Sequence, residues 1–437
     1  MYRGMWLLFC CVLGMVAVVQ ADDWPQWRGP DRDGVWRESG IVRQLTDDNI
    51  KVLWRQEIGA GYCGPTVADR RVFVMDRVLE PEQRERILCF DSITGKQLWK
   101  VEYPCEYRGV SYTAGPRASV TIDGTRAYAL GTMGHLHCLD AWNGEILWKR
   151  DLNADYNILT DNARTNRMPI WGIAAAPLIY DDLLILHPGG RDDCSVVALD
   201  KKSGQEEWRA LDDRAQYSAP IVTRQGGKDV LVIWTGDSVA GLAPRTGKKY
   251  WRFPFTPRNM PIGVATPAVD DDQVFVTSFY DGSLMLRMND DMTVDKVWQA
   301  SGPSETRTKA LHSIISTPII IDDYIYGVDS HGELRCLEKD TGKRVWEDLT
   351  AVPKARWSTI HFVKHRDQVW MFTERGDLIQ AKLTPEGYEE LGRVHLIDPT
   401  EEQLRRRGGV CWAHPAFADR CIFVRNDREI ICVSLKD

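Results

Sequence analysis

The stretch LHCLDAWNGEILWKRD at residues 136–151 decides the fold of this chain, because the chain repeats it several times. Near-copies are ILCFDSITGKQLWKVE (87–102), VVALDKKSGQEEWRAL (196–211) and LRCLEKDTGKRVWEDL (334–349). Each copy has an acidic residue, then a glycine four positions later and a tryptophan four positions after the glycine. A repeat of this kind indicates a fold built from equivalent units.

A second phrase precedes each copy and contains a proline, an apolar run, a polar turn and another apolar run, as in STPIIIDDYIYGVD (316–329). It begins at Pro65, Pro116, Pro177, Pro220, Pro267, Pro318 and Pro415, with Ile360 in the remaining place, which makes eight units. Each unit predicts four short antiparallel strands, because Asn-Gly and Thr-Gly pairs accept the positive φ of tight hairpin turns. Four strands every 40 to 50 residues or so are typical of a β-propeller blade.

We therefore predict an all-β, eight-bladed β-propeller of four-stranded antiparallel blades over residues 50–437. The N-terminal strand KVLWRQEIG (51–59) has no blade before it, and the C-terminal piece CIFVRNDREIICVSLKD (421–437) lacks a fourth strand. Pairing the two would complete blade eight and close the ring without a free sheet edge.

The repeated tryptophans and turn glycines are interpreted as structural. An indole on each outermost strand can fill the gap between neighbouring blades. The tryptophans are Trp54, Trp99, Trp148, Trp208, Trp251, Trp298 and Trp346, and the glycines are Gly95, Gly144, Gly204, Gly247 and Gly342.

The N-terminus predicts export. Residues 1–21 contain Arg3, an apolar run and the small-residue pattern Val19-Gln20-Ala21, which is typical of a signal peptide. The apolar run is short for a membrane span, so an uncleaved anchor is the weaker interpretation. We expect a periplasmic or secreted protein, monomeric, with no transmembrane segment after cleavage. Its net charge of −7 favours neither nucleic acid nor an anionic membrane.

The Asp-x-x-Thr-Gly-x-x-x-Trp phrase resembles the repeat of the pyrroloquinoline quinone (PQQ) family of β-propellers over residues 50–437. The preceding segment DWPQWRGPDRDGVW (23–36) resembles the N-terminal stretch of exported PQQ-like propellers, many from planctomycete-type bacteria. We expect residues 22–49 to form a strap along the side or a face of the disc. The resemblance implies either a PQQ-dependent oxidoreductase with calcium or a non-enzymatic scaffold, similar to the propeller of the outer-membrane β-barrel assembly machinery.

The residues favour the scaffold, a non-catalytic protein that holds a protein or small ligand on one face. A quinoprotein needs several oxygen ligands for calcium and a carboxylate as general base. No such set can be mapped here. The large enzymes carry two adjacent cysteines beside PQQ. In this sequence the only adjacent pair is Cys10-Cys11, which lies within the predicted signal peptide. We therefore expect no cofactor, with a divergent PQQ oxidoreductase as the alternative. A propeller glycosidase would need two carboxylates across a cleft, which spacing cannot reveal.

Residues just before each proline should line the mouth of the central channel, because the connections between blades open there. We predict an aromatic, weakly basic face for a flat or sugar-like ligand or a peptide, and the alternative is that these rings only cap the blades. The candidates are Tyr62, Tyr112, Arg117, Trp171, Tyr217, His312, Trp357, Trp412 and His414.

Two long connections, 153–172 and 396–412, offer a second surface. Arg164, Arg167 and the run Arg405-Arg406-Arg407 could bind an acidic partner or a carboxylate. The alternative for the arginine run is a short solvated helix with internal ion pairs.

No metal site is predicted. His135 and His137 point the same way on a strand, but no third ligand can be placed beside them. The paired aspartates near 181, 270 and 322 fit hairpin turns better than calcium. Cys89, Cys138, Cys336 and Cys432 occupy one slot and are interpreted as buried fillers. Cys63 and Cys411 are candidates for a disulfide, with Cys105 as the competing partner, and the alternative is that these thiols are free.

Overall fold

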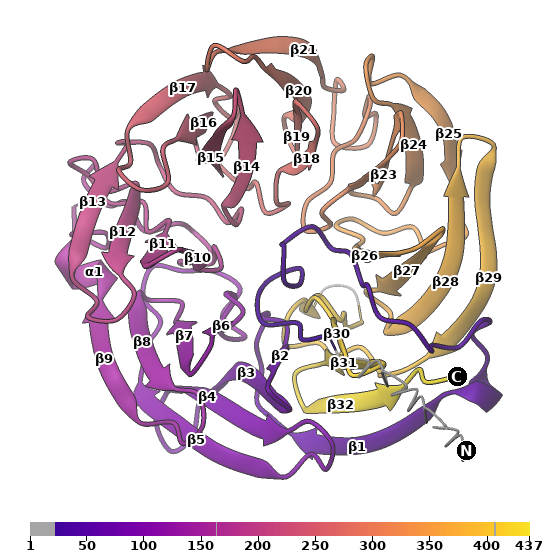
Figure 1. Ribbon diagram of the computed structural model, residues 1–437, viewed down its shortest axis with the longest axis horizontal. Coiled ribbons are helices and arrows are strands. Elements are labelled where there is room, and N and C mark those ends of the chain that lie inside the picture. Colours follow the sequence, from indigo (N-terminus) through magenta and orange to yellow (C-terminus); the bar gives the residue numbers. More distant parts are fainter. Residues whose placement is uncertain (1–21, 163, 406–407) are drawn as a thin grey trace, which may run out of the picture.

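The computed structural model describes residues 22–162, 164–405 and 408–437 (Figure 1). Eight antiparallel sheets of four strands each stand around a central axis, which confirms the predicted eight-bladed propeller. The predicted signal peptide, residues 1–21, lies outside the described residues. No helix in the described part of the chain is long and apolar enough to cross a membrane.

The blades follow one another along the chain, from β2 to β32. Blades 1 to 3 contain β2 (Thr66–Ala68), β3 (Arg71–Val78), β4 (Arg84–Asp91), β5 (Gln97–Pro104), β6 (Thr121–Asp123), β7 (Arg126–Leu130), β8 (His135–Asp140), β9 (Ile146–Asp151), β10 (Leu178–Tyr180), β11 (Leu183–Leu186), β12 (Val196–Asp200) and β13 (Glu206–Ala210). Blades 4 to 6 contain β14 (Ile221–Gln225), β15 (Lys228–Trp234), β16 (Ser238–Leu242), β17 (Lys249–Pro254), β18 (Ala268–Asp270), β19 (Gln273–Ser278), β20 (Gly282–Met288), β21 (Val294–Ala300), β22 (Ile319–Ile321), β23 (Tyr324–Val328), β24 (Leu334–Glu338) and β25 (Arg344–Asp348).

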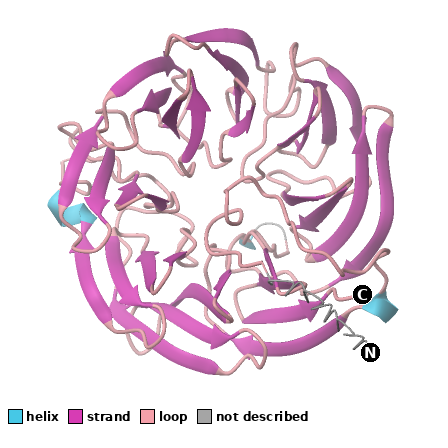
Figure 2. Ribbon diagram, viewed as in Figure 1, coloured by secondary structure: helices cyan, strands magenta, loops and turns pink. Residues whose placement is uncertain are grey.

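Blades 7 and 8 contain β26 (Ile360–His365), β27 (Gln368–Thr373), β28 (Asp377–Thr384), β29 (Gly387–His395), β30 (Ala416–Ala418), β31 (Cys421–Arg425), β32 (Glu429–Ser434) and β1 (Lys51–Glu57). Strand β1 pairs antiparallel with β32, so that Trp54 lies opposite Cys432. The two ends of the chain therefore close the ring as predicted, and no blade is left with a missing outer strand. Figure 2 shows that the described residues contain only short pieces of helix, among them α1 (Leu152–Asp155) and the 3-10 turn η1 (Asp47–Asn49).

The repeated phrase joins neighbouring blades at five boundaries of the ring. The indole Nε1 of Trp99 donates to the carbonyl of Ala141 at 3.1 Å, in the turn of the following blade. In that turn Gly144 has a φ of +77°, and a Cβ added there would lie 2.8 Å from the Trp99 ring. The same contact recurs for the pairs Gly95–Trp54, Gly204–Trp148, Gly247–Trp208 and Gly342–Trp298. The glycine is needed both for its backbone conformation and for the space beneath the ring.

Substitution of Gly144 by alanine is expected to lower the free energy of unfolding by about 2 kcal/mol, because it adds left-handed strain to a clash with Trp99. Gly124→Ala is the matched control, since Gly124 also has a positive φ but has no atom within 4 Å of an added Cβ. The control should cost less than about 1 kcal/mol. Guanidinium chloride unfolding of both variants measures the difference. Equal losses would mean that the ring of Trp99 does not restrict this turn.

The cysteines in the repeated slot lie opposite the outer-strand tryptophans. Cys89, Cys138 and Cys336 pair in register with Trp99, Trp148 and Trp346, and all three thiols are buried. A β-bulge follows this position in each blade. The slot is therefore a packing position facing the indole.

The predicted disulfide between Cys63 and Cys411 is not formed. All nine described cysteines are free. The Cys63 thiol lies 3.0 Å from the carbonyl of Met75, and the Cys411 thiol lies 3.7 Å from the carbonyl of Asp398. Each thiol points toward a nearby backbone carbonyl and not toward the other thiol. Ring closure therefore brings blades 1 and 8 together without bonding these two sulfur atoms.

The first part of the strap, residues 22–36, lies in the central channel, and residues 40–49 then run outward along blades 7 and 8, where Ile41 pairs with Lys436 and Leu45 binds the side chain of Gln380. Trp24 pairs with Val67 of blade 1, and Trp36 donates its backbone N–H to Lys364 of blade 7 at 2.8 Å. Between them, Arg32 reaches carbonyls at the start of the inner strands of blades 3 and 4. Figure 1 shows this indigo segment looping near the axis before it joins β1. The strap thus contacts inner strands on opposite sides of the ring.

Candidate functional site

The connections that enter the inner strands converge on one pocket at the channel mouth. Seven of the predicted residues line it: Tyr62, Tyr112, Arg117, Trp171, Tyr217, Trp357 and Trp412. The remaining lining is apolar except for the indole N–H of Trp27 and consists of Trp27, Ala174, Ala176, Ala219, Val264, Ile314 and Ile315. The cavity volume of the pocket is about 110 Å³. That volume is smaller than a pocket for a drug-sized ligand and suits one or two side chains of a partner.

The rings of the pocket support one another. Trp171 stacks on Tyr217 with ring centroids 4.9 Å apart. Tyr112 stands edge-on between Trp171 at 5.6 Å and Trp357 at 5.8 Å. The backbone of Tyr112 has a φ of 56° and that of Trp357 a φ of 68°, both in the left-handed region. Bulky residues rarely adopt this conformation, and such strain is concentrated at binding and catalytic sites.

Arg117 supplies the positive charge of the pocket. Its guanidinium donates to the carbonyls of Gly115 at 2.6 Å and Ser111 at 3.0 Å, and to the hydroxyl of Thr132 at 3.1 Å. It also lies 4.9 Å from the centre of the Tyr62 ring. No carboxylate in the described residues forms a salt bridge with it. The group is therefore held in place by neutral acceptors and keeps its charge available to an anion.

Trp27 of the strap also lines the pocket, a contribution that sequence reasoning missed. Its Nε1 donates to the Thr266 hydroxyl at 2.8 Å, and its ring lies 5.1 Å from that of His414. One feature of the sequence could have revealed this role: the segment DWPQWRGPDRDGVW (23–36) is rich in tryptophan and arginine. A segment that only covers a surface does not need so many of these residues. The strap is thus part of the site.

The two predicted histidines do not line the pocket. His312 is buried, accepts from the backbone N–H of Gly302 at 3.1 Å through Nε2, and places Nδ1 2.9 Å from the carbonyl of Phe279. Burial lowers its pKa. His414 lies buried against Trp27, and burial lowers its pKa well below the usual value, with the nearby charge of Arg28 acting in the same direction. Both imidazoles are neutral packing groups.

The predicted arginines of the first long connection line a second hollow, which shares Tyr217 with the channel-mouth pocket. Arg164 and Arg167 share it with Arg191 and Arg214. Arg167 pairs with Asp212 at 3.3 Å, and Arg214 pairs with Asp237 at 2.6 Å. Much of the positive charge is therefore already neutralised. In the second connection Arg405 is exposed, and Arg406 and Arg407 lie outside the described residues.

A closed ring of eight four-stranded antiparallel blades around one axis defines the protein as an eight-bladed β-propeller. Residues 83–348 match the PQQ_2 family, described as "Outer membrane protein assembly factor BamB". This match covers more than half of the chain, and the chain belongs to that family. The resemblance to PQQ-type repeats is thereby confirmed.

Curated relatives share this description at low identity. The assembly factor BamB of Shewanella oneidensis is 23% identical over 314 residues, covering 65% of this chain and 76% of the relative. The Yersinia pestis protein is 24% identical over 236 residues, covering 51% of this chain and 54% of the relative. The chain thus spans about three quarters of one relative and about half of the other. A planctomycete-type source finds no support among these relatives.

Solved structures agree on the fold. BamB from Moraxella catarrhalis has a TM-score of 0.58 at 15% identity, covering 88% of this chain and 97% of that chain. Quinohemoprotein alcohol dehydrogenase from Comamonas testosteroni has a TM-score of 0.63 at 12% identity, covering 95% and 80%. At these identities the likeness concerns the propeller alone, and it is shared by scaffolds and enzymes.

Proposed function

We propose that the protein is an exported, non-catalytic scaffold that holds a segment of a protein partner in the channel-mouth pocket. The observation that carries this proposal is the pocket itself, with its ring-lined wall, which includes Trp27, and the single cation Arg117. The segment it suits presents an aromatic or apolar side chain next to a carboxylate. The apolar group would lie against Trp171 and Tyr217, and the carboxylate would bind Arg117.

A protein is a better candidate than a metabolite for two reasons. Tryptophan, tyrosine and arginine are the residues most enriched among those that dominate protein–protein binding. The curated relatives are named outer membrane protein assembly factors, which supports a protein as the partner here too. The N-terminal leader pattern supports an exported protein.

The pocket residues do not fit calcium with PQQ. The lining contains no carboxylate and no side-chain amide, whereas calcium takes six to eight oxygen ligands. The Tyr62 hydroxyl already donates to the carbonyl of Gln403 at 3.3 Å, and the Tyr217 hydroxyl accepts from the backbone of Trp171 at 3.1 Å. No lining side chain could serve as the carboxylate base of an oxidoreductase or as one of the two carboxylates of a glycosidase. We therefore propose a function without a cofactor.

The test is the affinity of the purified protein for peptides selected from a random displayed library, measured by fluorescence anisotropy. Selected peptides should contain an aromatic residue close to an acidic residue or to a terminal carboxylate. Trp171→Ala and Arg117→Met should each weaken binding by about tenfold or more, since each removes an anchor of the pocket.

Trp142→Ala is the matched control, because Trp142 is more than half exposed on an outer turn, and this variant should bind as the wild type does. PQQ is titrated in the same assay with and without calcium. Saturable, calcium-dependent PQQ binding that is lost in Trp171→Ala would favour the oxidoreductase instead. Peptides that bind both pocket variants unchanged would place the partner elsewhere on the disc.

A further inference from the structure

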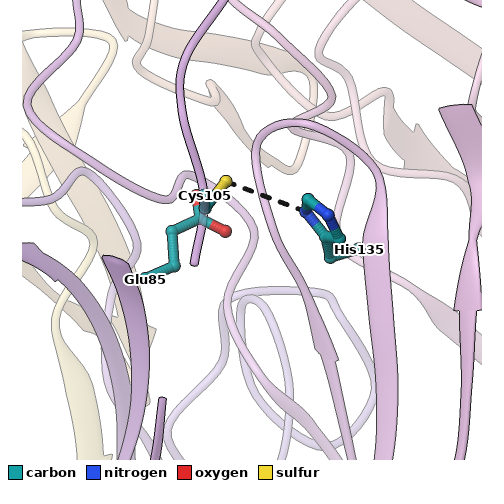
Figure 3. Close-up of side chains that lie close together, drawn as sticks. All are labelled: Glu85, Cys105 and His135. Atoms are coloured by element: carbon teal, nitrogen blue, oxygen red, sulfur yellow. Dashed lines mark hydrogen bonds between the residues drawn. The ribbon is translucent and has the colours of Figure 1, made fainter. Parts of the chain in front are cut away.

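Three metal-ligating side chains meet between blades 1 and 2, close to the channel mouth. They are Glu85 of β4, Cys105 just after β5, and His135 of β8 (Figure 3). One ligand atom from each lies within 4.8 Å of the others. We propose that these residues bind a zinc ion. From the sequence, no further ligand could be placed beside His135. In the folded ring, Glu85 and Cys105 of the preceding blade lie next to it.

The charge of Glu85 is the strongest reason to expect a cation. Its carboxylate is fully buried and accepts from the hydroxyls of Tyr103 at 2.7 Å and Tyr107 at 2.5 Å. It also accepts from the backbone N–H of Thr132 at 3.0 Å. No lysine, arginine or histidine in the described residues forms a salt bridge with it. A buried carboxylate without a counter-charge is costly, and a bound cation would compensate it.

The carboxylate still has room for a ligand. An ionised carboxylate offers about four lone-pair positions, and these three donors leave one of them, toward which the Cys105 thiol is directed. A Cβ added at Gly131 would lie 2.1 Å from Oε2 of Glu85, so the backbone passes directly against this group. The same donors and the close backbone hold the carboxylate in one orientation, as the outer shell of a metal site does.

The sulfur and nitrogen atoms are spaced as a tetrahedral ion requires. The Cys105 Sγ lies 3.7 Å from the His135 Nδ1. With Zn–S of about 2.3 Å and Zn–N of about 2.0 Å, a tetrahedral angle separates the two ligands by about 3.5 Å, close to the observed distance. Figure 3 shows the thiol and the ring nitrogen directed toward each other, with the carboxylate beside them.

The donor set selects the metal class. A thiolate, an imidazole and a carboxylate suit zinc, whereas calcium and magnesium prefer oxygen ligands alone. On binding, the metal replaces the thiol proton of Cys105, and that proton leaves to solvent. Three protein ligands leave the fourth position to water, and His135 is only partly buried.

The experiment uses the purified protein after treatment with a chelator, titrated with zinc against a chromophoric competitor and separately with cobalt. We expect one equivalent of tightly bound metal and a sulfur-to-cobalt charge-transfer band. Cys105→Ser and His135→Gln should each weaken zinc binding by at least about 100-fold, because each removes a direct ligand. Both should also remove or shift the cobalt band.

Cys194→Ser is the matched control, because Cys194 is also buried and free but belongs to no such cluster in the described residues, and it should bind as the wild type does. Glu85→Gln provides a third variant should Cys105→Ser fail to fold. Absence of stoichiometric binding would overturn the proposal. Binding that survives Cys105→Ser and His135→Gln would also overturn it, since exposed groups such as His395 with Asp377 would then be the ligands.

Discussion

Replacement of Arg32 by alanine is expected to lower the free energy of unfolding by about 3 kcal/mol. The side chain is buried in the channel, and burial lowers its pKa to about 9, so it remains charged at neutral pH. Its guanidinium donates to the carbonyls of Pro220 at 3.0 Å and Ala176 at 3.3 Å, and to the Gln26 side chain at 2.8 Å. Alanine would leave these acceptors without their donor and a cavity at the axis.

Arg37→Ala is the matched control within the same strap. Arg37 is half exposed and pairs with Asp33 at 2.5 Å, and such surface ion pairs contribute at most about 1 kcal/mol. Unfolding in guanidinium chloride, followed by tryptophan fluorescence, measures both changes. Similar small losses for the two variants would mean that the strap does not hold the inner strands together.

Trp36→Ala should be more destabilising still, by about 4 kcal/mol. Its ring is buried against Phe417 at 4.9 Å, His365 at 5.2 Å and Trp370 at 5.8 Å. Its Nε1 also donates to the Glu38 carboxylate at 2.8 Å. The substitution therefore opens a large cavity between the strap and blades 7 and 8, and removes a donor from a buried acid.

Trp142→Ala serves again as the control, now for the loss of an indole. Trp142 is exposed and contacts Arg71, whose guanidinium lies 3.5 Å from the ring centre. That contact is worth about 1 kcal/mol at most. Denaturant midpoints with unchanged m-values would assign the difference to stability. If Trp36→Ala unfolded at the same midpoint as the wild type, the strap would be dispensable to the core.

Much of the channel-mouth pocket could be predicted by counting back from the prolines. Tyr62, Tyr217 and Trp412 stand three positions before their prolines, and the rigid ring brings such equivalent positions to one mouth. The same argument failed for His414, one position before its proline, because the strap covers that position from within the channel. The distance from the proline predicts that a residue lies at the start of an inner strand. It does not predict whether another segment of the chain, such as the strap, covers that residue.

The sequence by itself determined the eight blades, their strand order and the closure of the ring. These features follow from local patterns that recur: apolar alternation, turn glycines, and a tryptophan such as Trp99 set a constant distance from its glycine. Such local patterns can be recognised in the sequence because every blade folds with the same short-range geometry. The pattern is therefore seen eight times, once in each blade.

Only the tertiary structure decided what fills the axis and what meets between blades. The strap occurs once, so no repeat reveals that Trp27 lines the pocket or that Arg32 binds carbonyls of blades 3 and 4. The free thiols of Cys63 and Cys411, and the meeting of Cys105 with His135, likewise depend on side-chain directions across a blade boundary. Contacts between residues that are remote in sequence and unrepeated leave no periodic signal, and their geometry exists only once the ring has closed.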